Sequence, residues 1–169
     1  MKCKILISVV ICFFIIGCNL FESEEDYQEF IFEIQYTNWA WGFDHSGTYI
    51  DYKGNIYSYE YDTTETYISV EKSIYTREEL KTRYKSNKKF IDQISKDVLE
   101  QKKELISPAI QDQYSDTLNT GIDMGQLSYI CYTYEYNLYH KIVLRSEGDF
   151  TYQILSAEAD SLINWLKSL

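Results

Sequence analysis

The sequence predicts an α+β fold: an antiparallel sheet of about five to seven strands packed against one long central helix and a short C-terminal helix. Three observations lead to this prediction. Tyrosine-rich runs in both halves of the chain alternate apolar and polar residues with a period of two, as half-buried strands do. A helix-start signal and a helically spaced apolar stripe lie between these runs. A second capped segment closes the chain.

The size and charge of the chain limit its organisation and its partners. It has 169 residues, 45% of them hydrophobic, which suits a single globular domain. We expect a signal segment at 1–17, an acidic tether at 18–28 and one α+β domain at 29–169. The net charge of −10 repels nucleic-acid phosphates, so no nucleic-acid partner is expected.

The N-terminal segment has the pattern of an export signal. Lys2 and Lys4 precede an apolar run over residues 5–16, which as a helix is roughly 18 Å long, against about 30 Å for a hydrocarbon core. A positive start before a short apolar run is typical of a signal peptide. An ordinary secretory signal cut elsewhere and an uncleaved anchor are the alternatives, but the sequence near residue 17 holds no A-x-A-like cleavage site.

The run ends in Ile15-Ile16-Gly17-Cys18, which resembles the lipobox of bacterial lipoproteins. The resemblance covers the first 18 residues. It implies that Cys18 receives a diacylglycerol and that a lipoprotein signal peptidase cuts between Gly17 and Cys18. Acyl chains contribute about 0.8 kcal/mol per buried methylene, so two or three of them anchor a protein stably. The implied location is extracytoplasmic, on the cell membrane or the outer membrane, with the acyl chains on Cys18 holding the membrane.

The segment after Cys18 is acidic, with the run "FESEEDYQE". It indicates a solvated tether, and it also resembles the acidic export tags of surface lipoproteins in some Gram-negative bacteria. Cys3 and Cys12 belong to the signal, so Cys131 is the one thiol left in the domain. We expect it to be a buried structural cysteine in a strand.

The first half of the domain predicts strands. Residues 30–37 alternate Phe30, Phe32, Ile34 and Tyr36 with a second set that includes Glu33, Gln35 and Thr37. The stretch from Asp51 to Gly54 predicts a hairpin turn with glycine in the left-handed position. The returning strand carries its tyrosines on one face, and residues 66–70 predict a third strand.

A helix is predicted to begin after Thr76, because Thr76 and Glu79 form a capping box. An apolar stripe then predicts one long helix to Ser107-Pro108, with a break point at Ser86-Asn87. Its members are Leu80, Tyr84, Ile91, Ile94, Val98 and Leu105.

The last third predicts a long loop at 107–126, a strand over 127–136 and two strands over 138–155 joined near Gly148. Ser156 caps the closing helix, whose buried side is formed by Leu162, Trp165, Leu166 and Leu169.

No group of residues in the sequence indicates catalysis. Asp44-His45-Ser46 contains the residue types of a catalytic triad, but sequence neighbours rarely place the base between the nucleophile and the orienting acid. We interpret the three as polar residues of a Gly-rich loop. His45 and His140 show no metal-ligand spacing. Neither a metal nor another cofactor is expected.

The aromatic residues supply the remaining functional signal, with 17 Tyr, 8 Phe and 3 Trp. Aromatic side chains dominate protein interfaces and stack on sugar rings. The candidate binding surface consists of Trp39, Trp41, Tyr57, Tyr59 and Tyr61. Two hypotheses follow: a non-enzymatic binding protein with an envelope protein partner, or a carbohydrate-binding module or weak glycan-active enzyme.

Overall fold

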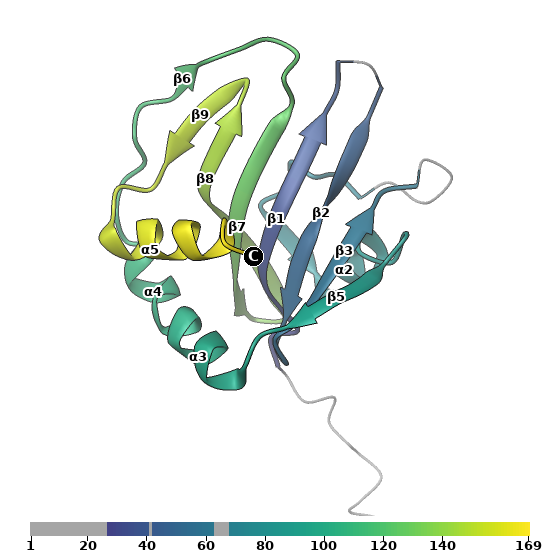
Figure 1. Ribbon diagram of the computed structural model, residues 1–169, viewed down its shortest axis with the longest axis vertical. Coiled ribbons are helices and arrows are strands. Elements are labelled where there is room, and N and C mark those ends of the chain that lie inside the picture. Colours follow the sequence, from purple (N-terminus) through teal and green to yellow (C-terminus); the bar gives the residue numbers. More distant parts are fainter. Residues whose placement is uncertain (1–26, 41, 63–67) are drawn as a thin grey trace, which may run out of the picture.

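The structure is a computed structural model that describes residues 27–40, 42–62 and 68–169. Its strands are all antiparallel, in the order β5-β3-β2-β1-β7-β8-β9-β6, with β4 paired to β8 (Figure 1). The strands are β1 (Phe30–Asn38), β2 (Asp44–Asp51), β3 (Asn55–Glu60), β4 (Ile74–Thr76), β5 (Lys89–Gln93), β6 (Leu118–Asn119), β7 (Gln126–Glu135), β8 (Leu138–Gly148) and β9 (Phe150–Gln153). The helices are α2 (Arg77–Arg83), α3 (Lys96–Glu104), α4 (Ile106–Ala109) and α5 (Ala157–Leu166).

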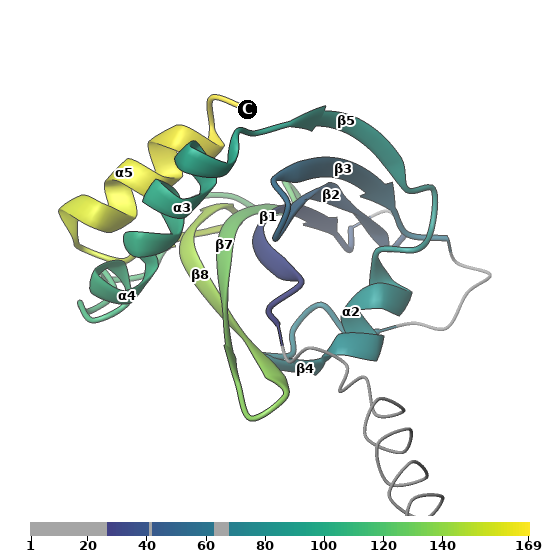
Figure 2. The same ribbon diagram turned by 90° about the horizontal axis from the view of Figure 1, so that it is seen from below.

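The sheet is strongly curved and has a hydrophobic cluster on each face. Figure 2 shows α3, α4 and α5 on the convex side, and α2 with β4 on the concave side. The convex cluster is mainly aliphatic, with members such as Leu99 and Leu162, and also includes the aromatic Phe32. The concave cluster is tyrosine-rich and packs Leu80 of α2 and the C-cap residue Tyr84 against the sheet. Seven of the described tyrosines are therefore core residues: Tyr49, Tyr59, Tyr75, Tyr84, Tyr129, Tyr132 and Tyr139.

The prediction of one long central helix and five to seven strands is wrong, because the segment after Thr76 is divided and the sheet has nine strands. Asn87 adopts a left-handed conformation (φ 48°), which ends the turn that follows α2. Residues 89–93 then extend and pair with β3, so Phe90 and Ile91 are exposed strand residues. Ser95 accepts a bond from the Val98 amide and starts α3. The helix thus ends at Arg83, three residues before the predicted break point at Ser86-Asn87.

Two further predictions about elements need correction. Pro108 does not end a helix there, since α4 runs from Ile106 to Ala109. The strand predicted at 66–70 lies partly outside the described residues, and residues 68–70 are not in a strand.

Predictions that rest on short-range hydrogen bonds are confirmed. The Thr76 hydroxyl accepts from the Glu79 amide, and the Glu79 carboxylate accepts from the Thr76 amide at 2.8 Å. Asp51 Oδ1 accepts from the Lys53 and Asn55 amides, and Gly54 has φ 81°. Ser156 caps α5, and Cys131 is fully buried in β7.

Candidate functional site

The polar residues of β1 lie inside the molecule. A register shift between Phe30 and Phe32 places Phe30 in the concave cluster and Phe32 in the convex cluster. Glu33, Gln35 and Thr37 are buried. The predicted alternation of apolar and polar residues is therefore wrong at the start of this strand. The face that carries Glu33, Gln35 and Thr37 is buried as well.

Glu33 is the acceptor at the centre of a buried hydrogen-bond network. Its carboxylate is fully buried and lies 2.8 Å from Arg83 Nη2 of α2. The hydroxyls of Tyr59 and Tyr132 donate to the two carboxylate oxygens, Tyr132 at 2.5 Å. Burial alone raises the pKa of Glu33, but the charges of Arg83 and Lys141 and the two tyrosine bonds outweigh it and hold the pKa below its ordinary value. Glu33 is therefore an ionised anchor for Arg83.

His45 joins this network from β2 and is 2% exposed. Its Nε2 lies 3.2 Å from the Tyr59 hydroxyl and 3.3 Å from Arg83 Nη2. Since Arg83 can only donate, Nε2 is the acceptor and the ring is neutral with its proton on Nδ1. Burial and the charge of Arg83 lower the pKa of His45 to about 3. The interpretation of residues 44–46 as a polar loop is wrong, because they form the start of β2.

Gln35 connects the network to a second cation, Lys141 of β8. Gln35 Oε1 accepts from Arg83 Nη2 at 2.7 Å and from Lys141 Nζ at 3.1 Å. Lys141 Nζ also donates to the Val70 carbonyl at 2.7 Å. Burial and the nearby Arg83 lower the pKa of Lys141 to about 8. A lysine with this pKa is a feature of functional sites as well as of structural clusters.

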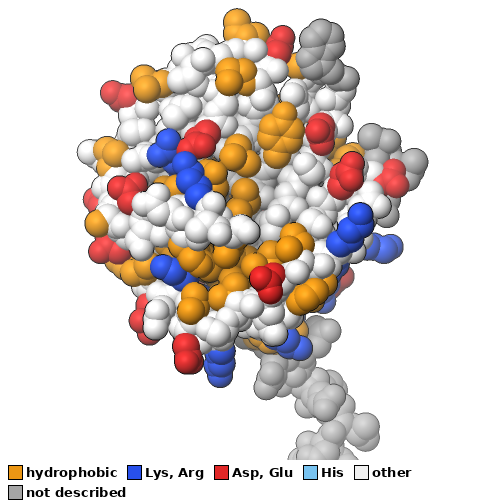
Figure 3. Space-filling model, viewed as in Figure 1, with side chains coloured by type: hydrophobic (Ala, Val, Ile, Leu, Met, Phe, Trp, Pro, Cys, Tyr) orange, Lys and Arg blue, Asp and Glu red, His pale blue; other side chains and the backbone are white. Residues whose placement is uncertain are grey.

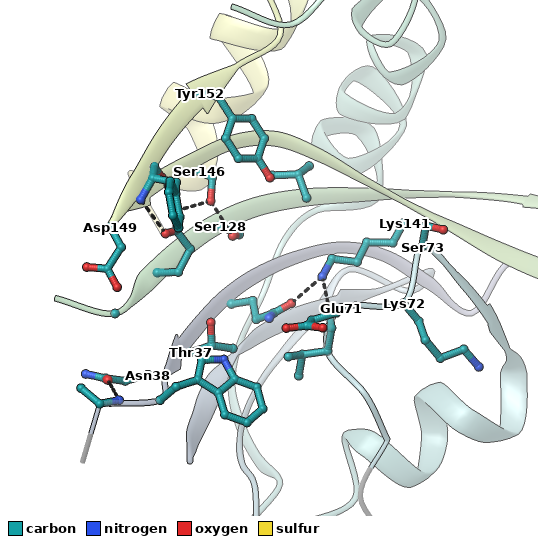
Figure 4. A pocket seen from close by; sticks show the side chains of 18 of the residues that line it. Thr37, Asn38, Glu71, Lys72, Ser73, Ser128, Lys141, Ser146, Asp149 and Tyr152 are labelled. Carbon is teal, nitrogen blue, oxygen red and sulfur yellow. Dashed lines mark hydrogen bonds between the residues drawn. The ribbon is translucent and has the colours of Figure 1, made fainter. Parts of the chain in front are cut away.

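Lys141 lies in the wall of an open pocket of about 580 Å³ on the concave side of the sheet. Figure 4 shows Lys141 reaching into this space, with Ser128, Ser146 and Tyr152 along one side and Thr37 and Asn38 along the other. Its volume is in the range of small-molecule sites. The polar lining residues include Gln35, Thr37, Gln126, Ser128, Lys141 and Ser146, and the aromatic ones are Trp39, Phe150 and Tyr152.

Loop residues supply the remaining wall and rim of the pocket. Residues 70–73, which precede β4, form one wall, and Asp123 and Asp149 lie at the rim. Asp149 accepts from the Met124 amide at 2.9 Å, which ties the two rim segments together. Ser128 Oγ and Ser146 Oγ lie 3.1 Å apart. Polar hydroxyl and amide groups thus surround the Lys141 ammonium, and Glu71 and Lys72 add charged groups to the wall formed by residues 70–73.

Exposed apolar side chains gather at the end of the molecule where β1 and β8 finish. Figure 3 shows hydrophobic side chains at this upper end, above the helices. The exposed residues of this end are Trp39, Leu118, Ile122, Met124 and Phe150, which we call the distal rim. Because β1 starts at the opposite end, the first described residue, Tyr27, lies far from the distal rim (Figure 1).

The structure separates the residues of the predicted binding surface. Trp39 is 56% exposed and lines the pocket. Tyr59 is buried and donates to Glu33, so it is not available to a partner. Tyr57 and Tyr61 are half-buried, Tyr57 against Tyr49 and Tyr61 against Phe43. Trp41 lies outside the described residues, as do Gly17, Cys18 and the rest of residues 1–26.

Sequence reasoning missed Lys141, Gln35, Glu33 and Arg83. The available signal was the placement of Glu33 and Gln35 in a strand otherwise rich in apolar residues. Among the described residues, no three His, Cys, Asp or Glu side chains group as metal ligands. None of the described helices combines the length and the apolar character needed to cross a membrane. Comparisons of the chain with protein-family models, with characterised proteins and with solved structures give no significant match.

Proposed function

We propose that this protein is a lipid-anchored, extracytoplasmic binding protein, held on the cell membrane or the outer membrane by acyl chains on Cys18, that binds a small polar ligand in the pocket beside Lys141. The observation that carries the binding role is the open pocket of about 580 Å³, in which hydroxyl, amide and amine groups converge. Glu33 cannot act as a catalytic group on a ligand in this pocket, because its side chain is fully buried. A binding role therefore fits better than an enzymatic one.

The position of the pocket agrees with an anchor at Cys18. Tyr27 lies nine positions after Cys18, and at roughly 3.3–3.6 Å per residue an extended tether would reach about 30 Å. The first described residue, Tyr27, lies at the end where β1 starts, while the distal rim lies at the other end (Figure 1). The pocket mouth would then face away from the membrane and towards solutes or a partner.

A carbohydrate ligand is the second candidate, and one observation favours it. Trp39 and Phe150 are more than half exposed and both line the pocket. Exposed aromatic rings beside hydroxyl and amide groups are suited to stacking on a sugar ring and bonding its hydroxyls. A protein partner that covers the distal rim would use the same rings.

The binding role is tested by a thermal-shift screen of the full-length chain in detergent against sugars and small polar metabolites. Ser73 is exposed on the pocket wall, so Ser73→Trp should fill the pocket without disturbing either core cluster. A ligand of the pocket should raise Tm in the parent protein and in Lys89→Trp, an exposed control on β5, but not in Ser73→Trp. A screen without any stabilising ligand, or ligands that ignore Ser73→Trp, would contradict the proposal.

The anchor is tested on the native protein. Mass spectrometry should find the mature chain starting at Cys18 with a diacylglycerol on its sulfur, and Cys18→Ser should abolish processing and membrane fractionation. A mature protein with an intact first residue would show that the lipobox resemblance is misleading.

A further inference from the structure

We infer that the ligand of this pocket carries a carboxylate, bound by the Lys141 ammonium, on a ring-shaped body that lies between the aromatic walls. The inference rests on the proposed function, because it names the ligand class of the same pocket. It would cover both an aromatic acid and a sugar acid, since the two share a carboxylate and a flat or ring-shaped body.

The first argument is a count of charges on the concave side. Arg83 and Lys141 are two cations, and Glu33 is the buried carboxylate that they share, while the exposed Glu71 on the pocket wall favours the charged form of Lys141 from farther away. Glu33 is already occupied by Arg83 and by the hydroxyls of Tyr59 and Tyr132. Lys141 makes no ion pair with any described residue, and its closest acceptors are the neutral oxygens of Gln35 and Val70. A buried ammonium beside a second cation is costly unless an anion contacts it directly.

The second argument is a count of hydrogens on Lys141. The ammonium has three N–H donors, of which one reaches Gln35 Oε1 and one reaches the Val70 carbonyl. The third remains for a ligand, and the side chain lies in the pocket wall (Figure 4). A carboxylate would accept this hydrogen and place a negative charge in direct contact with the ammonium. A neutral hydroxyl would satisfy the hydrogen but leave the ammonium without an anion in contact.

The third argument concerns the walls, which fit the rest of the ligand. The Ser128 and Ser146 hydroxyls on one side and Thr37 on the other can bond further ligand oxygens (Figure 4). Trp39 and Phe150 offer ring faces near the mouth. The carboxylates of Glu71, Asp123 and Asp149 disfavour a second negative charge on the ligand. Together these features favour a ligand with one carboxylate on a compact body over a polyanion.

The test compares each acid with a neutral molecule of the same shape, by isothermal titration of the full-length chain in detergent at pH 7. Benzoate is paired with benzamide, and glucuronate is paired with glucose. At least one acid should bind tenfold or more tightly than its neutral counterpart, and which acid binds distinguishes the aromatic source from the sugar source. Affinity for the acid should fall as the pH rises from 7 to 9, since Lys141 loses its proton in that range.

Three variants separate charge from structure. Lys141→Met keeps the aliphatic stem and should weaken acid binding at least tenfold, whereas Lys89→Met, at an exposed position of β5, should leave it unchanged. Lys141→Met should also fold, because it removes a costly buried charge. Gln35→Glu places a carboxylate on Lys141 Nζ and should compete with the acid, lowering its affinity while the fold is retained.

Three results would overturn the inference: equal binding of the acids and their neutral counterparts, unchanged acid binding in Lys141→Met, or no binding by either acid. The proposed function is decided separately by the wider screen. If neutral sugars or metabolites bind in a way that Ser73→Trp abolishes, the pocket is a binding site and only the carboxylate assignment fails.

Discussion

Replacing Glu33 by Gln removes the carboxylate that pairs with a buried guanidinium. Gln keeps the size of the side chain and one acceptor oxygen, so the change is mainly one of charge. Arg83 is 3% exposed and would be left with a neutral partner at Gln35 Oε1, 2.7 Å from Nη2. Breaking a buried ion pair by removing one member costs about 3–5 kcal/mol. For a chain of this length each 1 kcal/mol corresponds to about 2–4 °C, so Tm should fall by roughly 6–20 °C.

The assay is thermal and urea unfolding of the full-length chain, followed by circular dichroism. Glu100→Gln is the matched control, because Glu100 pairs with Lys103 at 3.1 Å on the exposed surface of α3 and should cost no more than about 0.5 kcal/mol. The double variant Glu33→Gln/Arg83→Met removes both charges and should be less destabilised than the sum of the single changes. A loss below about 1 kcal/mol in Glu33→Gln would refute the reasoning, since it would mean that water reaches the pair.

Three other predictions concern pH, thiol reactivity and backbone packing. The pKa of His45 is about 3 in the folded protein against an ordinary 6.5, so the stability that the neutral ring contributes is complete above pH 6.5 and falls by up to about 5 kcal/mol as the pH drops to 3. The free energy of unfolding of His45→Gln should therefore depend less on pH between 6.5 and 4.5 than that of the parent protein. Identical pH profiles of the two proteins would contradict this. Burial raises the pKa of Cys131 to about 12, so a disulfide exchange reagent should label this thiol at pH 8 only after the chain unfolds. Labelling of Cys131 in the folded chain would contradict this. A Cβ on Gly47 would lie 2.3 Å from the Ile34 carbonyl oxygen, so Gly47→Ala should cost about 1–3 kcal/mol by urea unfolding, and a neutral effect would show that β1 and β2 can separate locally.

The parts of the fold that could be predicted from the sequence are those that a few neighbouring residues determine. The capping box from Thr76 to Glu79 and the turn from Asp51 to Gly54 each use hydrogen bonds between residues at most four positions apart. Their geometry follows from side-chain chemistry and allowed backbone conformations. Such signals gave the start of α2 and the β2–β3 connection correctly.

The long helix could not be recognised as wrong from its own residues. Its apolar stripe has genuine helical spacing, but the segment around Phe90 and Ile91 is extended because the exposed edge of β3 accepts it as a partner. That edge is formed by residues about 35 positions earlier in the chain. Tertiary pairing overrides helical periodicity here, and only the Asn87 turn signal pointed the other way.

The candidate site lies beyond local reasoning for the same physical cause. Whether Glu33 is a solvated strand residue or a buried anchor depends on Arg83 and Tyr132, which are 50 and 99 residues away. Whether Lys141 is a surface lysine or a pocket cation depends on Gln35, 106 residues away, and on the carbonyl of Val70. Gln35 belongs to both arrangements, because one oxygen accepts from the structural cation and from the pocket cation. The network that stabilises the concave face therefore also sets the charge that a ligand meets, with Gln35 as the residue that links the two.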